Sequence, residues 1–257
     1  MKSIPSGKSA LPLFEAWPGI AHRLRNANQL LLLLDFDGTL VGLKPRPEDV
    51  RLDQSLRQLL SRLARRPGIS LGFISGRRRA DLRRRVNVSG ARYWGVHGWE
   101  DRAGKRLSRK TRKELLRAQK LLAERIVGLR GVWIEDKRAS FVLHFREASP
   151  QDARRAHAAA RFVLNSSTQL RMLAGKKVLE LLPPEVKGKG ATVEGLTEPP
   201  GTLVLYAGDD ATDESVFVAL RQGLTIHVGR SSRTHARYRV ENPSEVREFL
   251  ERLEAAV

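Results

Sequence analysis

The sequence contains no cysteine and no long apolar run. Without cysteine the chain has no disulfide, no thiolate ligand for zinc and no cysteine nucleophile. Its apolar stretches fall short of the roughly 20 residues that cross a bilayer, so we expect no membrane partner. Pro12 and Pro18 interrupt the apolar part of the N-terminal segment, a pattern unlike that of a secretory signal. A cytoplasmic protein is therefore expected.

Acidic residues are scarce relative to basic ones. The 257 residues include 47 Lys and Arg against 28 Asp and Glu, giving a formal net charge of +19 and a pI near 11.1. Such a charge permits nucleic-acid binding. The densest basic stretch, Arg62 to Arg85, has one aromatic residue, Phe73, in an apolar strand pattern, so stacking platforms for bases are missing. We expect its arginines to form solvated surface and do not expect nucleic acid as a partner.

Strand and helix patterns alternate at both ends of the chain. Residues 30–36 form a short apolar run typical of a strand buried on both faces. Further strands are expected over 69–76, within 91–100, over 202–210 and over 224–229. Helices are expected over 53–66, 78–86, 188–196, 213–221 and from Ser244, taken as the N-cap, onward. This alternation predicts an α/β fold with a doubly wound, mainly parallel sheet.

The middle of the chain has a different pattern. Helices are expected over 108–129 and 150–165, each followed by two strand-like segments: 132–136 and 140–146, then 169–174 and 177–182. An αββαββ order does not extend a parallel sheet. We therefore predict an α+β module at residues 104–183, inserted into a core made of residues 1–103 and 184–257.

Two acidic strings follow buried strands. Asp35 and Asp37 lie in the string DFDGTL, where open α/β sheets bind ligands. One carboxylate there can attack an electrophile while the other moves a proton, or both can face a metal. The string GDDATDE at 208–214 carries further acids that would repel each other without a cation. Read alone, it could instead be an acidic cap of the next helix. Together the two strings favour a shared hard cation, Mg²⁺ above all.

Two shorter strings suit a phosphate. Ser75, Gly76 and Arg77 follow a strand and open a helix, where backbone amides and a hydroxyl can hold an anion. An ordinary strand-to-helix turn would show the same residues. Lys187 or Lys189, in the string KGKG, could neutralise a transferred phosphoryl group or form a solvated basic turn.

These four strings, in this order, resemble the motifs of the haloacid dehalogenase-like phosphatases, which implies a core with an inserted cap. Over most of residues 30–252 the chain is also similar to the trehalose-6-phosphate phosphatases. The strings that carry this closer resemblance are GVHGWE at 95–100, IEDK at 134–137, GKKVLEL at 175–181, GDDATDE at 208–214 and the tail at 227–250. The expected reaction is hydrolysis of trehalose 6-phosphate, and the expected state is a monomer with a small-molecule sugar phosphate as partner.

The resemblance also implies roles. Asp35 would be the nucleophile that forms an aspartyl-phosphate, and Asp37 would protonate the leaving sugar oxygen and later activate water. Ser75 and one lysine would hold the phosphoryl oxygens. We choose Lys189 over Lys187 because apolar residues stand four and seven positions after it. Mg²⁺ would be bound by Asp35, the backbone carbonyl of Asp37 and Asp209, with Asp210 and Asp213 in support.

The substrate would meet a wider set of residues: Gly76, Arg77, His97, Gly98, Glu135, Lys137 and Glu180. The last three would contact sugar hydroxyls from the cap, although they could also be cross-strand ion pairs on a solvated sheet face. Two alternatives stay open. One is a related phosphatase for another sugar phosphate of the sucrose, mannosylglycerate or glucosylglycerol type. The other is a basic nucleic-acid-binding protein on a catalytically retired scaffold.

Overall fold

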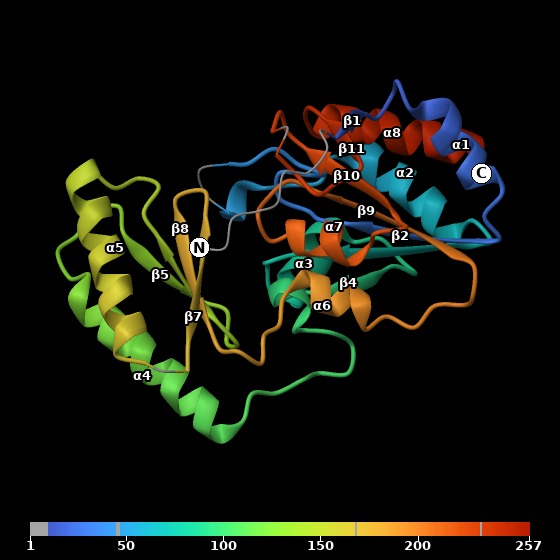
Figure 1. Cartoon of the computed structure of the whole chain (residues 1–257). Coiled ribbons are helices and arrows are strands. Elements are labelled where there is room, and N and C mark those ends of the chain that lie inside the picture. Colours follow the sequence, from blue (N-terminus) through green and yellow to red (C-terminus); the bar gives the residue numbers. More distant parts are fainter. Residues whose placement is uncertain (1–9, 45–46, 168, 232) are drawn as a thin grey trace. The chain divides into compact units, whose positions relative to one another are not determined.

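The computed structural model describes residues 10–44, 47–167, 169–231 and 233–257 (Figure 1). The chain forms two compact units: residues 103–187 make up the second, and the residues up to 102 and from 188 make up the first. The sequence pattern places the second junction after residue 183. In the structure residues 184–187 stay with the second unit, because the Thr111 hydroxyl donates to Glu185 and Arg171 donates to the Val186 carbonyl.

The first unit is built on a seven-stranded sheet with the order β1-β11-β10-β9-β2-β3-β4, all of whose neighbours pair in parallel. Its strands are β1 (Leu11–Pro12), β2 (Gln29–Leu34), β3 (Ile69–Ile74), β4 (Arg92–Trp94), β9 (Thr202–Gly208), β10 (Leu224–Val228) and β11 (Tyr238–Val240). Its α-helices are α1 (Trp17–Arg25), α2 (Gln54–Arg65), α3 (Arg79–Val86), α6 (Lys189–Glu194), α7 (Glu214–Ala219) and α8 (Pro243–Ala256). Two 3₁₀ turns, η1 (Pro47–Asp49) and η2 (Val96–Gly98), complete it.

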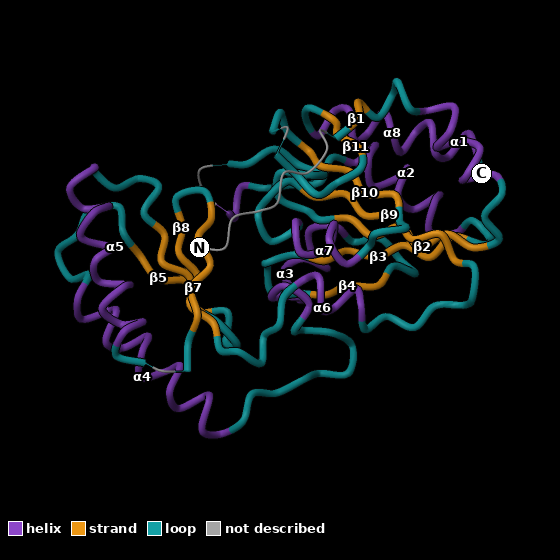
Figure 2. Tube along the Cα trace, viewed as in Figure 1, coloured by secondary structure: helices purple, strands orange, loops and turns teal. Residues whose placement is uncertain are grey.

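The leucine run shows why the sheet is covered on both faces. Leu30, Leu32 and Leu34 join a core with α1, α2, α3 and α8, whereas Leu31 and Leu33 join another core with α6 and α7. Successive side chains of a strand point to opposite faces, so a strand of five consecutive leucines needs an apolar layer on each side. Figure 2 shows helices on both sides of the strands. The predicted doubly wound sheet is confirmed.

The second unit has the predicted αββαββ order. Its elements are α4 (Arg109–Arg125), β5 (Trp133–Asp136), β6 (Phe141–His144), α5 (Pro150–Asn165), β7 (Arg171–Gly175) and β8 (Val178–Leu182). The strands form an antiparallel sheet in the order β5-β6-β8-β7. Leu115 and Leu122 of α4 and Ala156 and Val163 of α5 pack on one side of it, forming one apolar cluster with the sheet.

Two details differ from expectation. The N-cap of α8 is Asn242, whose side chain accepts bonds from the amides of Ser244 and Glu245, so the prediction of Ser244 as N-cap was wrong. Pro243 at the first helical turn explains the shift, because its fixed φ suits that position. None of the helices in the described ranges is long and apolar enough to cross a membrane.

Candidate active site

The carboxyl ends of neighbouring parallel strands bring the predicted motifs to one edge of the sheet. In the register of β2, Leu34 stands beside Ala207 of β9 on one side and beside Phe73 of β3 on the other. The residues that follow these strands therefore meet. They include Asp35 after β2, Ser75 after β3 and Asp209 after β9; Figure 2 labels these three strands.

A buried lysine stands among carboxylates at this edge. The Lys189 ammonium lies 2.8 Å from Oδ1 of Asp35 and 2.7 Å from Oδ1 of Asp213. Asp35 is 4% exposed and Lys189 is 2% exposed. Asp35, Asp209 and Asp213 each offer a carboxylate oxygen within 4.8 Å of the others, an arrangement that could hold a metal ion. Lys187, the alternative lysine, is exposed.

Asp213 acts as the anchor of this centre. Its Oδ1 accepts bonds from Lys189 and from the Tyr206 hydroxyl, and its Oδ2 accepts bonds from the amides of Asp209 and Asp210. Both oxygens of Asp213 already accept bonds. Asp213 is therefore better suited to positioning Lys189 and the turn at 209–210 than to serving as the main ligand of a metal ion. The supporting role of Asp213 at a metal stays a prediction.

Crowded negative charge sets the electrostatics. Burial raises the pKa of Asp35 well above its usual range; Lys189 opposes this, and the other aspartates add to it. Burial alone would lower the pKa of Lys189, but Asp213 and Asp35 raise it well above its usual value. Burial would likewise raise the pKa of Asp210, yet Lys189 and the bonds from Thr212 hold it at about 2. Burial and the neighbouring aspartates thus both oppose the charged form of Asp35, a condition that a bound cation would relieve.

Gly38 allows the DFDGTL string to lie close to Asp209, which follows β9. Gly38 has φ +86°, and a Cβ built on it would overlap the carboxylate of Asp209. A side chain at this position would strain the backbone and displace a candidate metal ligand. Steric exclusion of a side chain thus explains why the DFDGTL string has glycine at this position.

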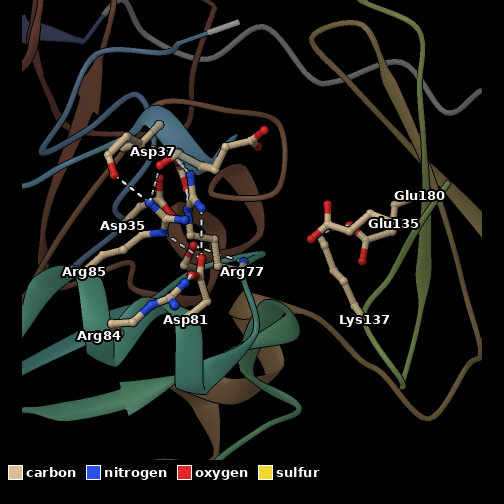
Figure 3. A network of polar contacts seen from close by, with 12 residues as sticks. Asp35, Asp37, Arg77, Asp81, Arg84, Arg85, Glu135, Lys137 and Glu180 are labelled. Carbon is tan, nitrogen blue, oxygen red and sulfur yellow. Dashed lines mark hydrogen bonds and ion pairs between the residues drawn. The ribbon is translucent and has the colours of Figure 1, made fainter. Parts of the chain in front are cut away.

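Asp37 does not join the aspartate cluster but faces Arg77. The Arg77 guanidinium donates to both oxygens of Asp37, at 2.7 Å each, and its third nitrogen donates to Asp81 at 3.0 Å. Asp81 also accepts from Arg84 and Arg85, as Figure 3 shows. A two-pronged Arg–carboxylate pair fixes the position of both partners. Arg77 is therefore placed to orient Asp37.

The arginine run is only partly solvated surface. Arg83 and Arg84 are exposed, as expected, but Arg85 is buried and donates to the carbonyls of Glu48 and Val50. The expectation that Arg85 lies on the solvated surface was wrong. Asp81 and Arg85 lie four residues apart on one face of α3, and Arg77, which precedes the helix, donates to the same carboxylate.

Ser75, Gly76, His97 and Gly98 also come together. Ser75 is buried, and its carbonyl accepts a bond from the His97 amide at 2.9 Å. A Cβ on Gly76 would approach the His97 ring to 2.9 Å, and one on Gly98 would overlap the Thr192 side chain. Three successive left-handed residues, with φ of 47° at Val96, 57° at His97 and 100° at Gly98, form the turn. Strained backbone of this kind persists only where the surrounding packing holds it. Here the strained turn packs against Ser75 and Gly76.

The second unit groups the three predicted sugar contacts on one sheet face. The Lys137 ammonium lies 3.4 Å from Glu180, and Glu180 also accepts a 2.5 Å bond from the Ser140 hydroxyl. Glu135 bonds to His144 at 2.9 Å. Burial would raise the pKa of Glu135, but the His144 bond and the Lys137 charge lower it. Figure 3 shows the side chains of Glu135, Lys137 and Glu180 near one another.

Sequence reasoning missed four participants: Tyr206, Asp81, Arg85 and His144. Tyr206 was read only as part of a buried strand, yet its hydroxyl holds Asp213. The four-residue spacing of Asp81 and Arg85 could have revealed their pair, because such residues share a helix face. His144 gave no signal, since its bond to Glu135 depends on strand register.

This fold and this aspartate–lysine centre define a haloacid dehalogenase-like phosphatase scaffold: a parallel doubly wound core with an inserted α+β unit. Residues 33–248 match the family model described as Trehalose-phosphatase. The chain belongs to the trehalose-phosphatase family.

Individual relatives agree with this assignment. The chain is 30% identical to Probable trehalose-phosphate phosphatase D of Arabidopsis thaliana, over 95% of this chain and 71% of that protein. It is 31% identical to Probable trehalose-phosphate phosphatase 2 of Oryza sativa subsp. japonica, over 95% and 72%. The structure of the C-terminal domain of a C. albicans trehalose-6-phosphate phosphatase superposes with a TM-score of 0.82 over 99% of this chain and 100% of that one. At 22% identity, this last similarity concerns the fold alone.

Proposed function

We propose that the protein is a Mg²⁺-dependent phosphatase that hydrolyses trehalose 6-phosphate to trehalose and phosphate. The observation that carries this proposal is the buried contact of Lys189 with Asp35 beside Asp209, at a strand edge of a trehalose-phosphatase family member. The named activities of the plant relatives supply the substrate. The same chemistry on another sugar phosphate is the alternative that the experiment must separate.

The donor set fits the proposed metal. Carboxylate oxygens of Asp35 and Asp209 are hard ligands of the kind Mg²⁺ prefers, and a cation beside them would offset the burial and the neighbouring acids that raise the pKa of Asp35. The Asp37 backbone carbonyl is proposed as a further ligand. When bound, the ion would neutralise charge that develops on the transferred phosphoryl group.

Different residues of the chain would carry out the separate steps of the reaction. The Asp35 carboxylate attacks phosphorus, and the bond between phosphorus and the sugar oxygen breaks as the aspartyl-phosphate forms. Asp37 gives a proton to the leaving sugar oxygen and later takes one from the attacking water. Ser75 and Lys189 hold phosphoryl oxygens. Gly76, Arg77, His97 and Gly98 are proposed to line the substrate.

We assign substrate selection to the second unit. Carboxylates accept bonds from sugar hydroxyls and ammonium groups donate to them, so Glu135, Lys137 and Glu180 supply both kinds of contact on one sheet face. In the free protein Lys137 pairs with Glu180 and Glu135 bonds to His144, so these charges are satisfied until a sugar replaces some of the bonds. The division implies that substitutions on this face change preference among sugar phosphates more than they change phosphoryl transfer.

The test is phosphate release from a panel of sugar phosphates with and without Mg²⁺. We expect the highest kcat/KM on trehalose 6-phosphate and little release without the metal. Preference for a sucrose, mannosylglycerate or glucosylglycerol phosphate would overturn the substrate, and activity in a chelator would overturn the metal. Asp35→Asn should abolish turnover, since the amide cannot form the intermediate; surviving turnover would refute covalent catalysis. Inactivity on the whole panel together with salt-sensitive nucleic-acid binding would favour a retired scaffold.

A further inference from the structure

An exposed tryptophan stacks on a parallel histidine ring in the second unit. Trp133 of β5 and His144 of β6 are direct cross-strand partners. Their ring centroids are 3.9 Å apart and their planes differ by 3°. Trp133 nevertheless keeps 44% of its surface exposed, whereas the side chain of His144 is largely covered. The imidazole therefore supports the indole from one side and leaves apolar surface open.

The indole lies on the sheet face that the helices do not cover. Side chains alternate along a strand, so Trp133 and Glu135 share one face of β5 while Ile134 points to the other. Ile134 packs against the cluster formed with α4 and α5. The same alternation puts His144 with Trp133, opposite Leu143 in the buried core. Trp133 therefore stands on the same face as the predicted sugar contacts.

The platform is held in place by the polar cluster beside it. Glu135 Oε2 lies 2.9 Å from Nε2 of His144, and this bond fixes the imidazole under the indole. Lys137 in turn lowers the pKa of Glu135 by its charge, after the larger effects of burial and the His144 bond. An exposed indole whose orientation is fixed by stacking loses little rotational freedom when a ligand binds, which favours binding.

We propose that Trp133, supported by His144, is a stacking platform for an uncharged hexose ring: the glucose unit of the substrate that carries no phosphate. This inference rests on the proposed function. One face of a pyranose presents C–H groups, which gain from contact with an aromatic face, while its edge hydroxyls need polar partners. The indole supplies the first and the neighbouring carboxylates supply the second.

Charges of both signs surround the platform. The Glu135 carboxylate is bonded to the imidazole, and the Lys137 ammonium lies 3.4 Å from Glu180. These groups offer acceptors and a donor to sugar hydroxyls and leave little net charge to attract a phosphate dianion. Phosphate chemistry and sugar stacking are thus assigned to different residues of the chain, the first to Lys189 and Ser75 and the second to Trp133.

Trp133→Ala in the full chain tests the platform, with Trp133→Phe as the conservative variant. The control is Phe162→Ala, which removes an equally exposed aromatic ring from α5; its exposed fraction is 43%, and the Arg125 guanidinium covers one face. Each variant is assayed on trehalose 6-phosphate and on p-nitrophenyl phosphate, an aryl ester without sugar. We expect Trp133→Ala to raise KM for trehalose 6-phosphate about three- to tenfold, with kcat within about twofold and p-nitrophenyl phosphate hydrolysis unchanged. Trp133→Phe should fall between wild type and Trp133→Ala, and Phe162→Ala should match wild type.

The other outcomes separate a failure of the platform from a failure of the proposed function. An unchanged KM in Trp133→Ala, or an equal loss on both substrates, would overturn the platform and leave the proposed function intact. If wild type prefers another sugar phosphate, the proposed substrate fails, and the platform is judged by the same comparison on that preferred ester. A wild-type enzyme that hydrolyses p-nitrophenyl phosphate but no sugar phosphate would overturn both.

Discussion

Replacing Asp81 by asparagine should destabilise the first unit and change how its stability depends on pH. Asp81 accepts bonds from Arg77 at 3.0 Å and from Arg84 and Arg85 at 2.7 Å. Asparagine keeps the shape but removes the charge that three guanidinium groups share. Arg85 suffers most, because it is buried and would keep only carbonyl partners.

The pKa of Asp81 gives the magnitude. Burial would raise this pKa, but the bonds from Arg85, Arg84 and Arg77 lower it from 3.8 to about 2. That fall corresponds to about 2 kcal/mol of stability, of which solvent screening leaves about 1 to 2 kcal/mol. Because the folded pKa is the lower one, the stabilisation is fully present above the unfolded pKa near 4 and is lost as the pH falls through about 2.

Urea unfolding of wild type and Asp81→Asn at pH 7, 5 and 3 measures this effect. The difference between the two proteins should be about 1 to 2 kcal/mol at pH 7 and 5 and roughly half of that at pH 3. Glu15→Gln, which neutralises an exposed carboxylate of the same unit, is the control and should change stability by less than about 0.5 kcal/mol. Equal stabilities at pH 7, or a difference that grows toward pH 3, would refute the reasoning.

Two further predictions concern the centre itself. Lys189→Met should cost about 3 kcal/mol at pH 7 in urea unfolding, since it leaves buried carboxylates without their ammonium, whereas Lys187→Met on the exposed lysine should be close to neutral. The raised pKa of Lys189 means that this contribution is complete at neutral pH and is lost only in strong alkali; equal costs for the two lysines would contradict it. Millimolar Mg²⁺ should raise the Tm of wild type but not of Asp209→Asn, with a monovalent salt of equal ionic strength as control. A Tm that rises equally in both proteins would place the cation elsewhere.

The strongest sequence signals came from residues whose local pattern determines their environment. Leu30 to Leu34 predicted a strand covered on both faces, because strands of parallel sheets have such continuous apolar runs, and the structure buries both faces. Asp35 and Asp209 could then be placed at one edge, because parallel strands end on the same side. The inserted unit followed from the change of pattern after residue 103.

The parts that escaped prediction depend on contacts between distant residues. The two-residue strand β1 exists only because β11 offers it a partner, and its short sequence carries no periodic signal. Arg85 is buried because the carbonyls of Glu48 and Val50 come from a distant loop to accept its bonds. The stacking of Trp133 on His144 requires the register of β5 and β6, which no local pattern specifies.

The insertion of the second unit also sets the order in which a growing chain can complete its sheet. β2 and β3 are synthesised early, but β9, which pairs with the other edge of β2, follows the whole inserted unit. During synthesis this edge of β2 stays unpaired until more than 160 further residues have been added. An unpaired edge on an apolar strand is prone to aggregation. Lys189 arrives 154 positions after Asp35. The charged centre is thus among the last parts of the molecule to assemble, and substitutions that slow the inserted unit should reduce the yield of folded protein without touching the chemistry.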